Sequence, residues 1–130
     1  MSRLQTRTPG QAVLEFAVAL PVFLMVVLGA VQFGLWYHAQ SVVVAAVREG
    51  ARAVALEGGL PEDGRATTRQ LLRAGLGRFQ ARVEVDVDED AEVAVVTARG
   101  SLAPIVPLPG VAAGLPLQAR SAVLRERFRP

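Results

Sequence analysis

The stretch FAVALPVFLMVVLGAVQFGLWY, residues 16–37, decides the fold of this chain. Eighteen of its 22 residues are apolar, and residues 16–47 contain no Asp, Glu, Lys or Arg. An apolar run of about 18 residues or more is long enough to cross a membrane as a helix. We therefore expect a transmembrane helix at about 16–37. The rest of the 130 residues suffices for one small domain, which excludes a large multidomain enzyme.

The helical pattern continues beyond the apolar stretch. Apolar residues recur at spacings of three and four, while charged residues occupy the opposite face. Glycines and a proline in Gly58-Gly59-Leu60-Pro61 then end the pattern. A helix from Gln11 to Leu56 would be about 69 Å long, roughly twice the thickness of a bilayer core. We therefore expect one helix over 11–57, with an exposed amphipathic part at 38–57 that lies in water or against other protein.

Residues 58–130 are expected to form a small α+β domain. Leucines at helical spacing predict a short helix over 62–78, with Asp63 as its N-cap and Gly77 at its end. Alternation of valine with acidic residues then predicts a strand hairpin. The strands are expected at 82–88, 92–99 and 116–127, and a proline-rich apolar loop occupies 101–116. The predicted fold class is α+β, with a long helix, a short helix and a small antiparallel sheet of about three strands.

Composition and charge exclude several classes of function. The net charge is +2 and there is no cysteine, so we expect neither a nucleic-acid surface nor a thiolate metal site. Asp86, Asp88 and Asp90 match the first ligand positions of a calcium loop, but Ala91 replaces the required glycine and Thr97 the bidentate glutamate. No general base or nucleophile pair can be assembled from the remaining residues. We expect no enzymatic activity, no catalytic residue, no metal or cofactor and no small-molecule substrate.

The most informative local pattern lies at the start of the apolar run. A polar, basic leader, residues 1–10, ends at Gly10, and Glu15 stands five residues later inside the apolar sequence. A charge at a membrane helix centre costs about 2.5–3.5 kcal/mol on insertion scales, and less near the end, so it needs a partner or a function. Cleavage after Gly10 would create an α-amino group on Gln11, which is able to neutralise the Glu15 carboxylate of a neighbouring copy.

This pattern resembles the processing site of type IV prepilins. The version G-x-x-x-x-E-[FY], here Gly10 to Phe16, is typical of the tight-adherence (Tad/Flp) branch. The longer stretches GQAVLEFAVALPVFLMVVLGAVQFG, residues 10–34, and AAVREGARAVA, residues 45–55, are similar to TadE-like pseudopilins. In that family a segment of the form E-F-A-hydrophobic-P, with Pro21 here, precedes a block of the form A-A-x-R-E-G-A-R by about thirty residues.

The resemblance implies the roles of individual residues. A prepilin peptidase would cut between Gly10 and Gln11, and Glu15 with Phe16 would act in assembly through pairing with a neighbour's terminal amine. Pro21 would kink the helix. A candidate interaction surface consists of Arg48, Glu49, Gly50, Ala51 and Arg52. The implied partners are other pilins or pseudopilins, the Tad assembly platform and the membrane, and the implied roles are pilus biogenesis, adherence, biofilm formation and secretion.

Two other functions remain open at this point. Arg3 and Arg7 predict a cytoplasmic N-terminus in the inner membrane, with residues from about 40 onward outside. Trp36, Tyr37 and His38 then lie where an aromatic anchor at the membrane interface is expected. The first alternative is a single-pass signal-anchor envelope protein whose outer domain binds a ligand or protein and never assembles. The second is a secreted protein with a cleaved signal peptide, which the length of the apolar run disfavours.

Overall fold

The computed structural model describes residues 8–56, 58–79, 81–105 and 113–125. It contains helices α1 (Pro9–Ala55) and α2 (Pro61–Leu76), followed by strands β1 (Ala81–Glu89), β2 (Val93–Leu102) and β3 (Leu115–Leu124). The predicted α+β class is therefore confirmed. The predicted leader before Thr8, the helix end at Glu57, most of the proline-rich loop and the last residues of the third predicted strand lie outside the described residues.

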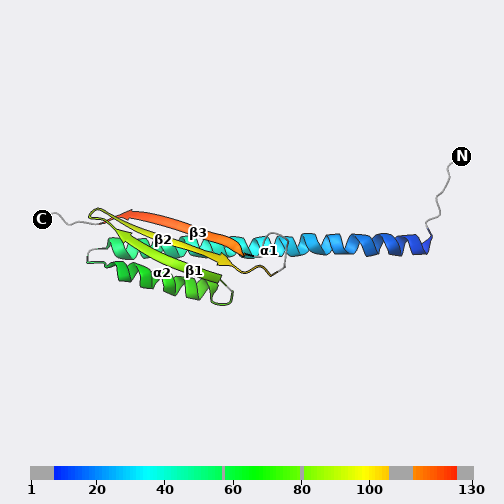
Figure 1. Ribbon diagram of the computed structural model, residues 1–130, viewed down its shortest axis with the longest axis horizontal. Helices are drawn as coiled ribbons and strands as arrows, with labels where there is room; N and C mark the ends of the chain where they lie inside the picture. The colour runs from blue at the N-terminus through cyan, green and yellow to red at the C-terminus, as the bar shows by residue number, and fades with distance from the viewer. Residues whose placement is uncertain (1–7, 57, 80, 106–112, 126–130) are drawn as a thin grey trace.

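Helix α1 is one continuous rod of 47 residues, about 70 Å long. It begins at Pro9, two residues before the predicted start at residue 11. Proline suits the first helical position because its φ is already helical and its missing N–H has no partner to lose there. The helix also runs through Pro21 without interruption, and Figure 1 shows it extending well beyond the rest of the molecule.

The second half of α1 belongs to the core of the domain. Its buried residues recur at helical spacing and include Val43, Val47, Ala51 and Val54. They pack against α2 on one side and against β2 and β3 on the other. Residues 38–57 were predicted to be an exposed amphipathic part. Of this segment, the face that carries the charged residues is exposed, whereas the opposite face is buried. Contacts with the small α+β part begin earlier still, since Gln32 and Trp36 form hydrogen bonds with Ile105 and Pro116.

Helix α2 begins and ends close to the predicted residues, with one correction. Leu60 is the N-cap, and Asp63 is the third helical residue, so the prediction of Asp63 as N-cap is wrong. The Leu60 N–H donates a hydrogen bond to Asp63 Oδ2 at 2.8 Å. The carboxylate thus caps the helix by reaching back to a free backbone donor. Gly77 is the C-cap, as predicted.

The three strands form an antiparallel sheet in the order β1-β2-β3. One face of this sheet carries Val85, Val96, Ala98, Leu102 and Leu117, all buried against the helices. Helix α1 lies under β2 and β3, while α2 lies under β1, as Figure 1 shows. Strand β2 extends to Leu102, three residues beyond its predicted end, because Ala81 and Arg82 of β1 pair with Leu102 and Ser101.

Candidate membrane-contact and assembly site

The first half of α1 presents an exposed apolar surface. Phe16 is 66% exposed and Met25 is 70% exposed, and the other large apolar side chains between Val13 and Phe33 are also mostly accessible. Among the described helices only α1 is long and apolar enough to cross a membrane, with a mean hydropathy of 2.4 over a window that has no buried residue. Each large apolar side chain gains about 1.5–3 kcal/mol on leaving water. This surface therefore requires lipid or neighbouring helices as its surroundings.

The predicted cleavage junction lies in the first turn of α1. A Cβ at Gly10 would meet nothing within 4 Å, and Gly10 and Gln11 are both exposed. The N-cap Thr8 provides no side-chain hydrogen bond, and the first turn contains no acidic residue. Without these contacts the first turn is only weakly held. The junction is thus open to an enzyme and does not contact the rest of the described chain.

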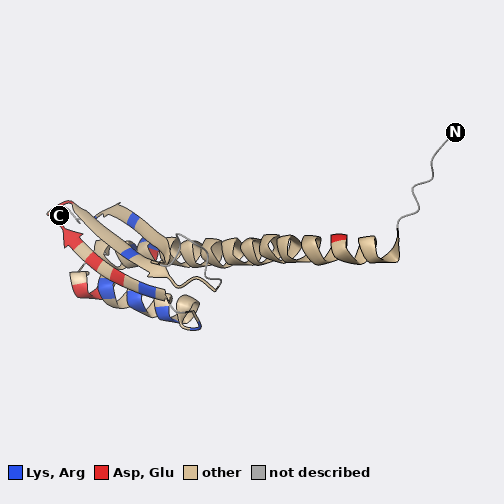
Figure 2. Ribbon diagram, turned by 45° about the vertical axis from the view of Figure 1, so that its right-hand side comes forward, with Lys and Arg blue, Asp and Glu red and all other residues tan. Residues whose placement is uncertain are grey.

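Glu15 and Phe16 both lie on the exposed apolar rod. Glu15 borders a shallow apolar groove that also includes Leu14, Val18 and Val22. Glu15 is the acidic residue in this half of α1, and Figure 2 shows a red band in an otherwise uncharged stretch of the helix. The carboxylate beside this groove distinguishes one position on the helix from the apolar surface around it. A neighbouring helix that packs in the groove would therefore meet the carboxylate at a defined register.

The predicted interaction block is divided between the surface and the interior. Arg48, Glu49 and Arg52 are exposed, and Arg52 lies 4.0 Å from Glu49 with side chains 75% and 55% accessible. Gly50 and Ala51 are buried. Gly50 faces α2 of the same chain, where its missing side chain permits a close helix crossing, and Ala51 belongs to the buried core. They are therefore not available to a partner, and the candidate surface reduces to the three charged residues.

Two hydrogen-bonded contacts join α1 to the edge strand β3. Trp36 Nε1 donates to the Pro116 carbonyl at 2.9 Å. Gln40 Nε2 donates to the Gln118 carbonyl at 2.6 Å, and the Gln118 N–H donates to Gln40 Oε1 at 3.2 Å. Four helical residues advance about 6 Å and two strand residues about 6.8 Å, so the spacings match. The side chains of Trp36 and Gln40 thus form hydrogen bonds with backbone N–H and C=O groups that have no partner strand at the edge of a sheet.

The aromatic cluster at the end of the apolar rod has two roles. Phe33 stacks beside Tyr37, with ring centroids 6.4 Å apart, and Tyr37 is 64% exposed. The indole N–H of Trp36 donates its hydrogen bond to β3 of the domain. The ring centroid of His38 lies 6.1 Å from that of Phe79. Phe33, Tyr37 and His38 are exposed, so Phe33 and Tyr37 remain available as an interfacial anchor. Trp36 was predicted as an anchor, and its contact with β3 left no local signal in the sequence.

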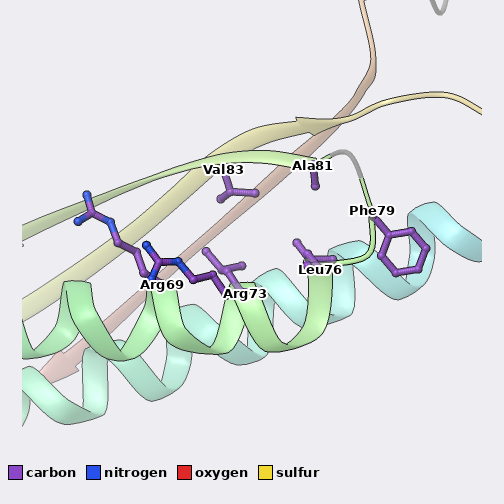
Figure 3. Close-up of a pocket in the computed structure, with 8 residues that line it drawn as sticks. Arg69, Arg73, Leu76, Phe79, Ala81 and Val83 are labelled. Carbon is purple, nitrogen blue, oxygen red and sulfur yellow. The ribbon is translucent and has the colours of Figure 1, made fainter.

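A pocket of about 380 Å³ lies between α2 and β1. Figure 3 shows Arg69 and Arg73 rising from α2 on the side of β1, with Leu76, Ala81 and Val83 forming apolar walls. The side chains that line this pocket include no acid, histidine or hydroxyl. Among the residues that the structure describes, no cluster of three or more His, Asp or Glu side chains has metal-binding geometry. Asp86 and Asp88 instead lie on the exposed face of β1.

One comparison with known proteins identifies a relationship. No curated protein and no solved structure matches this chain significantly. The family model described as TadE-like protein matches residues 10–52. This segment begins at Gly10, includes Glu15 and the exposed apolar rod, and ends at Arg52. The predicted resemblance is confirmed: over residues 10–52 the chain is similar to the TadE-like family, whose members are associated with the Tad pilus.

Proposed function

We propose that this chain is a minor pilin or pseudopilin of a Tad-type (Flp) pilus assembly and secretion system. The observation that carries the proposal is the single helix α1, whose exposed apolar half continues without a break into the core of the outer domain. The family match covers this same helix from its first turn to Arg52. A pilus-associated protein of this kind has a structural rather than an enzymatic role.

The proposed location is the cytoplasmic membrane. Residues at about 16–37 of α1 span the bilayer, the N-terminus is cytoplasmic and the small α+β domain lies outside. The length supports this arrangement, because 22 helical residues extend about 33 Å and a bilayer core is about 30 Å thick. Phe33 and Tyr37 then reach the outer interface, where aromatic side chains are favoured.

The proposed maturation step is cleavage between Gly10 and Gln11 by a prepilin peptidase. Cleavage leaves a charged α-amino group on Gln11, four residues before Glu15. In an assembly of parallel helices, the amine of one subunit pairs with the Glu15 carboxylate of the next. The groove of Leu14, Val18 and Val22 beside Glu15 supplies an apolar contact for the neighbouring helix.

The rigid connection between rod and domain supports an assembly role. The crossing of α1 and α2 and the contacts of Trp36 and Gln40 with β3 fix the domain on the helix. Insertion of the helix into, or at the base of, a filament therefore also sets the position and orientation of the outer domain. Adherence, biofilm formation and secretion follow as functions of the assembled machine.

The experiment that tests this function is N-terminal sequencing of the protein recovered from membranes of cells that contain the peptidase. A mature N-terminus at Gln11 is the expected result. Met1 would instead support the single-pass anchor that never assembles, and an N-terminus beyond residue 35 would support the secreted form. A matched culture without the peptidase should retain Met1.

A further inference from the structure

A buried amide at the junction of the rod and the domain has an unused donor. Gln32 is only 6% exposed, although it lies on the otherwise accessible apolar half of α1. Its Oε1 accepts a hydrogen bond from the Ile105 N–H at 2.8 Å. Its Nε2 is buried and makes no hydrogen bond in the described part of the chain. An unmet buried donor is unfavourable, so an acceptor supplied by another molecule would stabilise this amide.

The amide lines an open pocket of about 420 Å³. The pocket also includes the cationic residue Arg78 and apolar side chains of Leu35, Phe79 and Ile105. A guanidinium and an amide N–H both donate to anionic oxygen, and guanidinium geometry suits phosphate in particular. The chemistry of the pocket therefore fits a phosphate group that is attached to an apolar molecule.

The position of the pocket indicates the source of that phosphate. Gln32 lies 16 residues after Phe16, which is about 24 Å along the helix. If the apolar rod spans a bilayer, this distance places the pocket near the outer boundary of the hydrocarbon core. The exposed aromatic residues Phe33 and Tyr37 are its neighbours on α1. The proposed span ends at Tyr37, about 7 Å further along the helix, so the lipid headgroups begin just above the pocket.

The charges of the domain are sorted along its length. The turn from α2 to β1, with Arg78 and Arg82, lies beside the apolar rod, because His38 contacts Phe79 there. The first turn of α2 and the β1–β2 turn lie at the opposite end and carry Glu62, Asp63, Glu89 and Asp90. Figure 2 shows β1 blue near the rod and red toward its far end, while blue bands run along α2 toward that same end. At the opposite end Arg65 pairs with Glu62 and Arg125 lies 3.2 Å from Glu89, so an anionic membrane surface attracts the first end more strongly than the second.

We propose that the pocket of Gln32 and Arg78 binds the phosphate of an anionic phospholipid headgroup. Arg78 pairs with the phosphate, Gln32 Nε2 donates to one of its oxygens, and the acyl chains lie along the apolar rod. The bound lipid fixes the height and tilt of the outer domain above the membrane before assembly. This inference rests on the proposed membrane-spanning role of α1.

The test uses the full chain in nanodiscs made of equal parts phosphatidylcholine and phosphatidylglycerol. Native mass spectrometry counts the lipids that stay bound to the released protein. Wild type should retain phosphatidylglycerol in preference to phosphatidylcholine. Arg78→Gln should reduce this preference about fivefold, the effect expected for one arginine near an anionic surface. Gln32→Met, which keeps the side-chain length without the amide, should also reduce it while the near-ultraviolet circular dichroism of Trp36 remains unchanged.

Arg48→Gln is the matched control. Arg48 is also exposed and its replacement changes the net charge equally, but it lies on α1 16 residues beyond Gln32. If Arg78→Gln and Arg48→Gln reduce the preference for phosphatidylglycerol equally, the effect comes from the net charge of the protein. This result would overturn the proposed binding site. Binding of inorganic phosphate in detergent as tight as that of the lipid would overturn the lipid assignment. Wild type that floats with phosphatidylcholine vesicles but retains no phosphatidylglycerol refutes this inference alone, whereas failure to float refutes the membrane anchor itself.

Discussion

Gly50 of α1 and Gly64 of α2 face each other where the two helices cross. A Cβ on Gly50 would lie 2.9 Å from the Gly64 carbonyl oxygen, and a Cβ on Gly64 would lie 2.9 Å from the Gly50 carbonyl oxygen. The hydroxyl of Thr68 completes the contact, since it donates to the Gly64 carbonyl at 2.7 Å and is fully buried. The helices can approach this closely only because both positions lack a side chain.

Gly50→Ala should therefore destabilise the domain. The new methyl group would overlap Thr68 Oγ1 and press on backbone of α2, and overpacking of this kind costs about 1–3 kcal/mol. Chemical denaturation in mild detergent, followed by the circular dichroism of Trp36, measures the loss. Gly34→Ala is the control, because a Cβ there meets nothing within 4 Å. Equal stability of Gly50→Ala and wild type would contradict the close crossing.

The hydrogen bonds of Trp36 and Gln40 predict where a soluble fragment must begin. A fragment that starts at Leu35 keeps all three hydrogen bonds to β3, whereas one that starts at Val42 loses them along with buried Ala39. At about 1 kcal/mol for each hydrogen bond, the longer fragment should be more stable by at least ~3 kcal/mol. Urea denaturation of the two fragments compares their midpoints. Coincident midpoints would show that α1 is joined to the domain only beyond Gln40.

A single substitution isolates the indole contribution. Trp36→Phe keeps an aromatic ring but removes the Nε1 donor to the Pro116 carbonyl, so it should cost about 1 kcal/mol of unfolding free energy. Tyr37→Phe serves as the control, because Tyr37 is 64% exposed and its loss of a hydroxyl should leave the urea midpoint unchanged. A larger effect in the control than in Trp36→Phe would refute the assignment.

The sequence predicted the elements of the fold because each has a local period. Alternation of valine and acid in β1 leaves little choice of structure, and the apolar run of α1 has no competing interpretation. The extension of β2 to Leu102 was missed because Ser101 and Leu102 adjoin a proline-rich stretch that resembles a loop. Their pairing with Ala81 and Arg82 is set by the register of the hairpin, which single-residue preferences do not contain.

The candidate site was predictable only in part. The junction at Gly10 and the carboxylate of Glu15 carry a local motif, so the sequence alone predicts them, and both stay predictions. The direction in which Gly50 and Ala51 face depends on the path of α2, and small residues suit an internal crossing as well as an external one. The partners of Gln32 and Gln40 are 73 and 78 residues away along the chain, and no short-range pattern indicates them.

Gly10→Leu should block maturation without disturbing the fold. Because a Cβ at Gly10 meets nothing within 4 Å, any effect must arise from the peptidase rather than from packing. Immunoblots of membrane fractions should show the variant larger than wild type by the ten-residue leader. Gly29→Leu, at another open position of the same helix, should be processed normally. Equal mobility of wild type and Gly10→Leu would refute cleavage at this site.

Substitutions of Glu15 distinguish a protein that assembles into a filament from one that only anchors a domain in the membrane. Glu15→Ala and Glu15→Gln should both insert into the membrane, since removal of the charge makes insertion easier. Both should reduce cross-linking between subunits in membranes and incorporation into filaments. Glu15→Gln is the sharper variant because it keeps the shape and a hydrogen-bonding group while it abolishes the ion pair. An amine left buried without its charged partner in each subunit contact costs ~3–5 kcal/mol.

The controls for Glu15 distinguish a lost pair from a lost helix contact. Glu49→Gln removes the same charge from the exposed face of the domain half of α1, so it should cross-link as wild type does. Leu14→Ala trims the apolar groove beside Glu15 and should weaken cross-linking although the charge of Glu15 is kept. Undiminished cross-linking and filament formation in both Glu15 variants would mean that the carboxylate does not act in assembly. The chain would then be better described as a single-pass anchor, even if its N-terminus is Gln11.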